Sequence, residues 1–78
     1  MKNDKVFSTS ELPLSAFLIL NQFELLRVDK GRPGRATFHF EDKPERTDLV
    51  LRYFGKRTTV EPISFLEEIR NLKGLINN

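Results

Sequence analysis

The stretch Ala36-Thr37-Phe38-His39-Phe40-Glu41 decides the fold, because apolar and polar side chains alternate through it without a break. A period of two residues is typical of a β-strand that buries one face. We expect the apolar set (Ala36, Phe38, Phe40) to face a core and the polar set (Thr37, His39, Glu41) to face solvent. This strand therefore predicts a sheet with one covered side and one open side.

A turn segment with two glycines and a proline, residues 30–35, comes just before this strand. Residues 23–29, before the turn, alternate in part. Two extended runs around a short glycine-containing loop are typical of a β-hairpin. In that hairpin we expect Leu26 and Val28 on the inner face, and Leu25 and Arg27 on the outer face.

The first helix is expected from residue 11 to about residue 21. Ser10 is the preferred N-cap, because it places Pro13 in the first turn, where the missing N–H is harmless. Ser8, paired with Glu11 in a capping box, is the alternative. Apolar residues surround most of this helix, which predicts either a central helix or a helix that contacts a second copy of the chain.

Two more helices and a short strand complete the prediction. Asp42 is expected to cap a second helix, with Pro44 in its first turn and Gly55 just past its end. Residues 57–60 are rich in β-branched side chains and predict a third strand. Pro62 then begins a third helix, whose apolar stripe is Phe65, Leu66, Ile69, Leu72 and Ile76.

These elements predict one α+β domain over residues 1–78, in the order α-β-β-α-β-α. A small antiparallel sheet, made of the hairpin and the short third strand, packs on one face against three helices. Residues 1–6 are polar and expected to fray, with a short extended piece at Val6 and Phe7.

The composition excludes several classes of site. The chain has 78 residues, no cysteine and one histidine, so disulfides, thiolate zinc sites and multi-histidine metal sites are excluded. Neither a metal nor a cofactor is expected. The most apolar run, residues 12–20, is too short to cross a bilayer, which needs about 20 residues. We expect no membrane partner, and the absence of cysteine fits the cytoplasm.

Catalysis is not expected. His39 has Thr37 and Glu41 on its own face of the strand, but such neighbours on a sheet are usually solvated polar residues. The acidic residues Glu41, Asp42, Glu45 and Asp48 lack the spacing of a calcium loop and fit a helix N-terminus. No small-molecule substrate is evident, so we expect a binding protein and not an enzyme.

The cations are clustered although the formal net charge is only +2. One cluster lies in the hairpin and the other at the end of the second helix, and together they hold seven of the 13 lysines and arginines: Arg27, Lys30, Arg32, Arg35, Arg52, Lys56 and Arg57. If the clusters lie side by side, they form a patch that attracts phosphates, and a basic hairpin can lie in a groove of DNA. Nucleic-acid binding is the first hypothesis.

Binding to another protein is the alternative. The first helix and the residues after it offer apolar side chains for a contact with a partner or a second copy: Leu14, Phe17, Leu18, Phe23 and Leu25. Apolar patches on a small domain usually mark contact surfaces. A homodimer would also compensate for the small core of so short a chain.

A pattern of short motifs runs through nearly the whole chain: Phe7-Ser8-Thr9-Ser10-Glu11, Ala16-Phe17-Leu18 after Leu14, Phe38-His39-Phe40-Glu41-Asp42, Tyr53-Phe54-Gly55, Val60-Glu61-Pro62 and Arg70-Asn71-Leu72-Lys73. In this pattern the chain resembles a family of short bacterial and phage-associated proteins that is known only as a domain of unknown function. Pro13 departs from the family pattern. The resemblance implies a small bacterial or phage protein, such as a regulatory module of a phage or mobile element, and it brings no catalytic residues.

Overall fold

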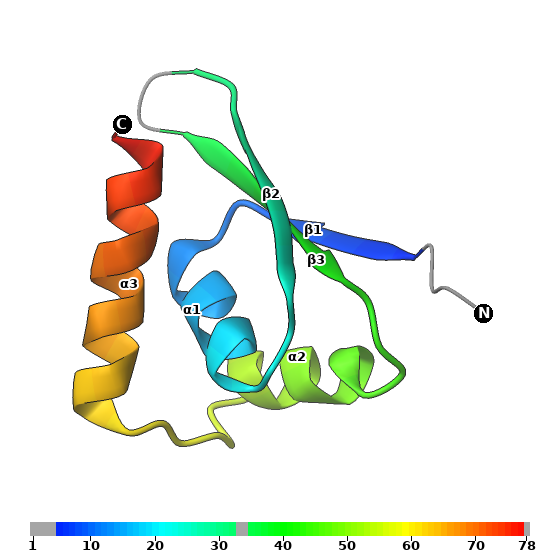
Figure 1. Ribbon diagram of the computed structural model, residues 1–78. Coiled ribbons are helices and arrows are strands. Elements are labelled where there is room, and N and C mark those ends of the chain that lie inside the picture. The colour runs from blue at the N-terminus through cyan, green and yellow to red at the C-terminus, as the bar shows by residue number, and fades with distance from the viewer. Residues whose placement is uncertain (1–4, 33–34, 78) are drawn as a thin grey trace.

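A computed structural model describes residues 5–32 and 35–77 of the chain (Figure 1). Along the chain the elements are β1 (Val6–Thr9), α1 (Leu12–Leu20), β2 (Leu25–Lys30), β3 (Ala36–Glu41), α2 (Arg46–Phe54) and α3 (Pro62–Ile76). Figure 1 shows α1 in the middle, α3 along one side of it, and α2 at the end opposite the β2–β3 turn. The expected α+β class, with three helices and an antiparallel sheet, is confirmed.

The sheet has β3 as its central strand, in the order β1-β3-β2, and both pairs are antiparallel. Phe40 pairs with Phe7 of β1 and with Leu25 of β2. The hairpin prediction is therefore confirmed for β2 and β3. Pro33 and Gly34 of its expected turn lie outside the described residues.

The third strand is not where the sequence placed it. Residues 57–60 form no regular secondary structure, and the third strand is β1, so the described elements run β-α-β-β-α-α. Residues 57–60 connect α2 to α3 at the end of the molecule away from the hairpin (Figure 1), so they do not lie beside β3. Of the residues expected to fray, 1–4 lie outside the described residues and Val6 begins β1.

The expected faces of Leu25 and Leu26 are reversed. Leu25 packs against the core, and Leu26 is 47% exposed. The register of β2 shifts between Leu25 and Arg27, so Leu25 pairs with Phe40 while Arg27 pairs with His39. A β-bulge adds one residue to a strand and inverts the alternation beyond it. Val28 and Arg27 keep their expected inner and outer positions on the far side of the bulge.

Helix α1 begins one residue later than expected. Its N-cap is Glu11 and not Ser10 or Ser8, and no side chain caps it, while Pro13 lies in the first turn as predicted. The fully buried Ser15 hydroxyl donates to the Glu11 carbonyl at 2.9 Å, which satisfies a polar group in the core.

Helix α2 also begins later than expected, at Arg46, and Asp42 does not cap it. The Asp42 carboxylate instead accepts from the backbone N–H of Lys43 and from the Arg46 guanidinium. Gly55 has an ordinary φ of −80°, and the left-handed residue that ends the helix is Lys56, with φ 60°. The start of α3 at Pro62 is confirmed.

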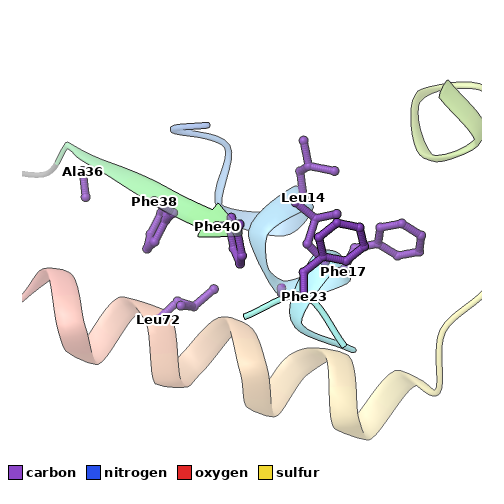
Figure 2. Packing of buried hydrophobic residues seen from close by; sticks show 9 residues of the cluster. Leu14, Phe17, Phe23, Ala36, Phe38, Phe40 and Leu72 are labelled. Atoms are coloured by element: carbon purple, nitrogen blue, oxygen red, sulfur yellow. The ribbon is translucent and has the colours of Figure 1, made fainter. Parts of the chain in front are cut away.

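The core joins α1, β3 and α3, and nine side chains fill it (Figure 2). Phe38 and Phe40 project from β3 toward Leu72 of α3, and all three are at most 1% exposed. The remaining members are four residues of α1, one residue that follows it and the first residue of β3: Leu14, Ala16, Phe17, Leu18, Phe23 and Ala36. The all-round apolar α1 is thus a central helix that is covered within one chain.

Truncation of Leu72 is expected to show how much the docking of α3 contributes to stability. Leu72→Ala should lower the free energy of unfolding by about 2–5 kcal/mol, because it leaves a cavity between α3 and β3. Leu66→Ala is the matched control on the same helix, and it should change stability by less than about 0.5 kcal/mol, since Leu66 is 56% exposed. Urea unfolding of both variants measures the difference. Equal losses would contradict this packing.

Candidate binding surface

The apolar contact predicted from the sequence is not on the surface. Leu14, Phe17, Leu18 and Phe23 are at most 3% exposed within the single chain, and Leu25 is half-buried against the same core. These side chains are used for folding because α3 and the sheet cover α1 on both sides. A partner that docks on this structure must therefore use other residues.

Five large apolar side chains on α2 and α3 are exposed: Leu75 of α3 by 43%, and four others by more than half. Leu51 and Phe54 of α2 are 63% and 58% exposed, and Ile63 and Leu66 of α3 are 62% and 56% exposed. The members of each pair are three residues apart, so each pair shares one side of its helix. We call these two exposed pairs, one on each helix, the apolar surface. The sequence assigned Leu66 to the apolar stripe of α3, and periodicity alone could not separate it from its buried neighbour Leu72.

Helix α2 is held at the periphery of the fold, with no fully buried residue. Its contact with α1 is made by Tyr53, whose ring lies 5.3 Å from that of Phe17 and whose hydroxyl donates to Glu11 at 3.4 Å. Partial burial, followed by the negative charge of Glu11, raises the pKa of Tyr53. Leu51 and Phe54 of α2 stay exposed, and the Phe54 ring meets the Tyr53 ring edge-on at 5.2 Å.

The two basic clusters do not form one patch. Arg35, at the hairpin end, lines a cleft with Ile76 at the last turn of α3, whereas the second cluster precedes Glu61 at the start of α3. With 15 residues, α3 is about 22 Å long. Figure 1 shows the hairpin turn and the α2–α3 connection near opposite ends of this helix. Because the two clusters do not lie side by side, the seven cations do not form one patch.

Each basic cluster also has a cation engaged by a carboxylate. Arg27 of the hairpin contacts Asp29 at 3.3 Å, and Arg52 of α2 contacts Asp48 at 3.0 Å. Arg32 and Arg35 are exposed at the hairpin turn, and Lys56 and Arg57 are exposed beyond α2. Each cluster therefore keeps two exposed cations, and the two clusters are separate candidates for phosphate contacts.

A chain of polar side chains crosses the open face of the sheet. Ser8 of β1 lies 2.7 Å from Nδ1 of His39, and Nε2 of His39 lies 2.8 Å from the Asp29 carboxylate. Arg27 completes this polar chain from the same strand as Asp29. The sequence placed His39 on this face but selected Thr37 and Glu41 as its neighbours, since partners on other strands depend on register.

The polar chain links all three strands of the sheet. Arg27, first, and then His39 hydrogen-bond to Asp29 and lower the pKa of that carboxyl group. Ser8, His39 and Asp29 do not line the cleft at the hairpin end, nor the clefts at the first turn of α2 and at the start of α3. A catalytic nucleophile and its base need a pocket that holds the substrate. This arrangement fits a stabilising contact between strands.

A cleft of about 490 Å³ lies between the start of β1 and the first turn of α2. Asp42 and Arg46, which line it, form an ion pair at 3.0 Å, and Arg46 also lies 4.4 Å over the Phe7 ring. The hydrogen bond with Arg46 lowers the pKa of Asp42 and raises that of Arg46. The second cleft, of about 290 Å³, lies between the end of α1 and the start of α3.

Within residues 5–32 and 35–77, no three histidine, aspartate or glutamate side chains gather closely enough to hold a metal ion. None of the helices in those ranges is both long and apolar enough to cross a bilayer.

The polar chain leads to a prediction about pH. Because the folded state lowers the pKa of Asp29, this group stabilises the protein above the unfolded pKa of about 3.9, and that contribution is lost as the pH falls through the lower folded value. Asp29→Asn should therefore destabilise the protein at neutral pH, and its difference from the parent should shrink in acid. Urea unfolding across this pH range measures the effect, with Asp48→Asn as the control on α2. A difference that is independent of pH would contradict the prediction.

Comparison with known proteins identifies the family and nothing finer. No curated protein matches the chain, and neither does any solved structure. A family model described as "Domain of unknown function (DUF5659)" matches residues 4–78, which is nearly the full length. The resemblance seen in the sequence is thereby confirmed at the level of the family, and the chain belongs to the DUF5659 family of domains of unknown function.

Proposed function

We propose that this chain is a small, non-catalytic binding protein that docks on another protein through the apolar surface of α2 and α3. The observation that carries the proposal is the exposure of Leu51, Phe54, Ile63 and Leu66 by more than half each. The core is complete without them, so their apolar character is not needed for the interior. Exposed apolar side chains that gather on one side of an element are typical of contact surfaces.

The partner expected for this surface has apolar anchors and acidic residues beside them. Lys56 and Arg57 follow Phe54 in the chain, and Arg70 lies on α3 one turn beyond Leu66. Charges of opposite sign around an apolar contact set the orientation of a partner and suppress wrong pairings. A regulatory module of a bacterium, a phage or a mobile element is the biological setting that we propose for such a contact.

Replacement of the apolar surface tests the proposal. Tagged parent protein and the double variants Leu51→Ser/Phe54→Ser and Ile63→Ser/Leu66→Ser are used to capture proteins from a bacterial lysate. At least one captured protein should bind a serine variant at least about 30-fold less, since two lost apolar anchors together cost about 2–4 kcal/mol. Glu68→Ser/Asn71→Ser, on the side of α3 that the helical period turns away from Ile63 and Leu66, is the control and should retain the partner. Identical capture by all variants would sink the proposal.

Nucleic-acid binding is the second candidate, and the hairpin cluster is the observation that favours it. Arg32 and Arg35 are exposed at the turn, with Lys30 at the end of β2. Figure 1 shows the end of β2 and the start of β3 at one end of the molecule, near the last turn of α3. A two-stranded ribbon with cations at its tip has the shape of the strands that some proteins insert into a DNA groove.

A salt titration tests the second candidate. With three or four phosphate contacts, affinity for an oligonucleotide should fall roughly 40- to 150-fold between about 50 and 200 mM salt. Arg32→Glu/Arg35→Glu should abolish binding in fluorescence anisotropy. Lys56→Glu/Arg57→Glu, at the other end of α3, should leave most of it. No binding at the lower salt concentration, or equal losses in the two variants, would reject a hairpin site.

A further inference from the structure

The outer edge of β1 carries backbone groups that have no strand beside them. The Asp42 N–H donates to the Lys5 carbonyl at 3.1 Å. From this pair the antiparallel pairing of β1 with β3 continues as far as Thr9, which lies opposite Phe38. Because hydrogen-bonded and non-hydrogen-bonded pairs alternate in an antiparallel ladder, the backbones of Phe7 and Thr9 face β3. The N–H and C=O groups of Val6 and Ser8 therefore face away from the sheet.

No described part of the chain covers this edge with a backbone partner. The strand order places β1 at the edge, and the hydrogen bonds between elements in residues 5–32 and 35–77 do not involve the backbone of Val6 or Ser8. Figure 1 shows β1 extending from the sheet on the side away from α3. An edge of this kind is a template for another strand.

The opposite edge of the sheet is protected and β1 is not. β2 carries Arg27, Asp29 and Lys30, has a bulge, and also contacts α3. Charges, bulges and a covering helix are the devices that keep edge strands from pairing. The four residues of β1 hold no charge and no proline, and Val6 is 48% exposed. A strand added to this sheet would therefore pair with β1 and not with β2.

We propose that two copies of this chain pair antiparallel through β1, around a two-fold axis at Phe7, so that their sheets become one continuous sheet. In this register Val6 exchanges backbone hydrogen bonds with Ser8 of the partner subunit, and Ser8 does so with the partner subunit's Val6. Each outward N–H and C=O of β1 thereby gains a partner. This interface is separate from the apolar surface of the proposed function.

The second copy is the occupant because β1 is complementary to itself. The outward groups lie at two positions, one on either side of Phe7, and a two-fold rotation about Phe7 exchanges them. The two Phe7 rings then meet as a non-hydrogen-bonded pair, in which side chains come closest. No like charges face each other within the strand, and Arg46 beside Phe7 is already paired with Asp42.

The interface is small, so a reversible dimer is expected. A strand of four residues forms a contact at the low end of protein interfaces, where association is transient. Sedimentation velocity from low micromolar to millimolar protein should show a shift from monomer to dimer. A parent protein that stays monomeric over this range overturns the proposal.

Proline at position 6 separates β1 pairing from other contacts. Val6→Pro removes an outward N–H that no intrachain ladder uses, and proline is tolerated at such edge positions. Each dimer loses two hydrogen bonds, so association should weaken about tenfold or more. Val6→Thr, the control, keeps the N–H and should dimerise like the parent. Circular dichroism checks the fold of both variants, and equal association of the two overturns the proposal.

Amide hydrogen exchange tests the register without a substitution. The amides of Val6 and Ser8 should exchange slowly only at concentrations where the dimer forms, whereas those of Phe7 and Thr9 should be protected at every concentration. Leu51→Ser/Phe54→Ser should dimerise like the parent, so failure of the docking proposal leaves this one intact. A dimer that this variant dissociates, or that leaves Val6 and Ser8 unprotected, overturns β1 pairing.

Discussion

The burial of Phe38 and Phe40 on the inner face of β3 is the constraint on which the rest of the structure depends. Both rings are at most 1% exposed, and Leu72 of α3 closes over them. Fully burying one such side chain is favourable by about 1.5–3 kcal/mol. A slip of one residue in the register would exchange the two faces of β3 and expose both rings, so the register is strongly specified.

The outer face follows from this inner face. Once Phe38 and Phe40 point inward, His39 must point outward, and the registers of β1 and β2 place Ser8 and Asp29 beside it. The polar chain across the sheet is therefore a consequence of packing on the other side. Among the residues that the structure describes, the same registers leave the outward backbone groups of Val6 and Ser8 without a strand beside them, because β1 is the last strand on its side.

The division between core and surface also explains where binding is possible. The side chains of α1 that looked most suited to a partner are consumed by the core, because α3 and the sheet enclose that helix. Helix α2 contributes only half-buried residues and keeps Leu51 and Phe54 outside. A short chain with one small core thus retains apolar side chains on its peripheral helices, and those are what a partner can reach.

Some helices and strands could be predicted from the sequence, and others could not. The alternation of β3 and the proline at the start of α3 each predicted their element, because the signal lies within a few residues. Strand β1 was not identified as part of the sheet, since four residues after a polar terminus show too little alternation. Gly55 lies just past the end of α2 as predicted, but the left-handed conformation falls on the next residue, Lys56, because Gly55 still has a helical φ.

By itself, then, the sequence determined the α+β class, the hairpin, the three helices and the inward face of β3, because the period of hydrophobic residues within one segment is a local property. Only the tertiary structure decided which strand flanks β3, which leucine faces the core at the bulge, and which partners surround His39. It also placed the two basic clusters near opposite ends of α3 and moved the candidate contact from α1 to α2 and α3. These outcomes depend on register and on the order of packing between distant segments, which no short stretch of the chain encodes.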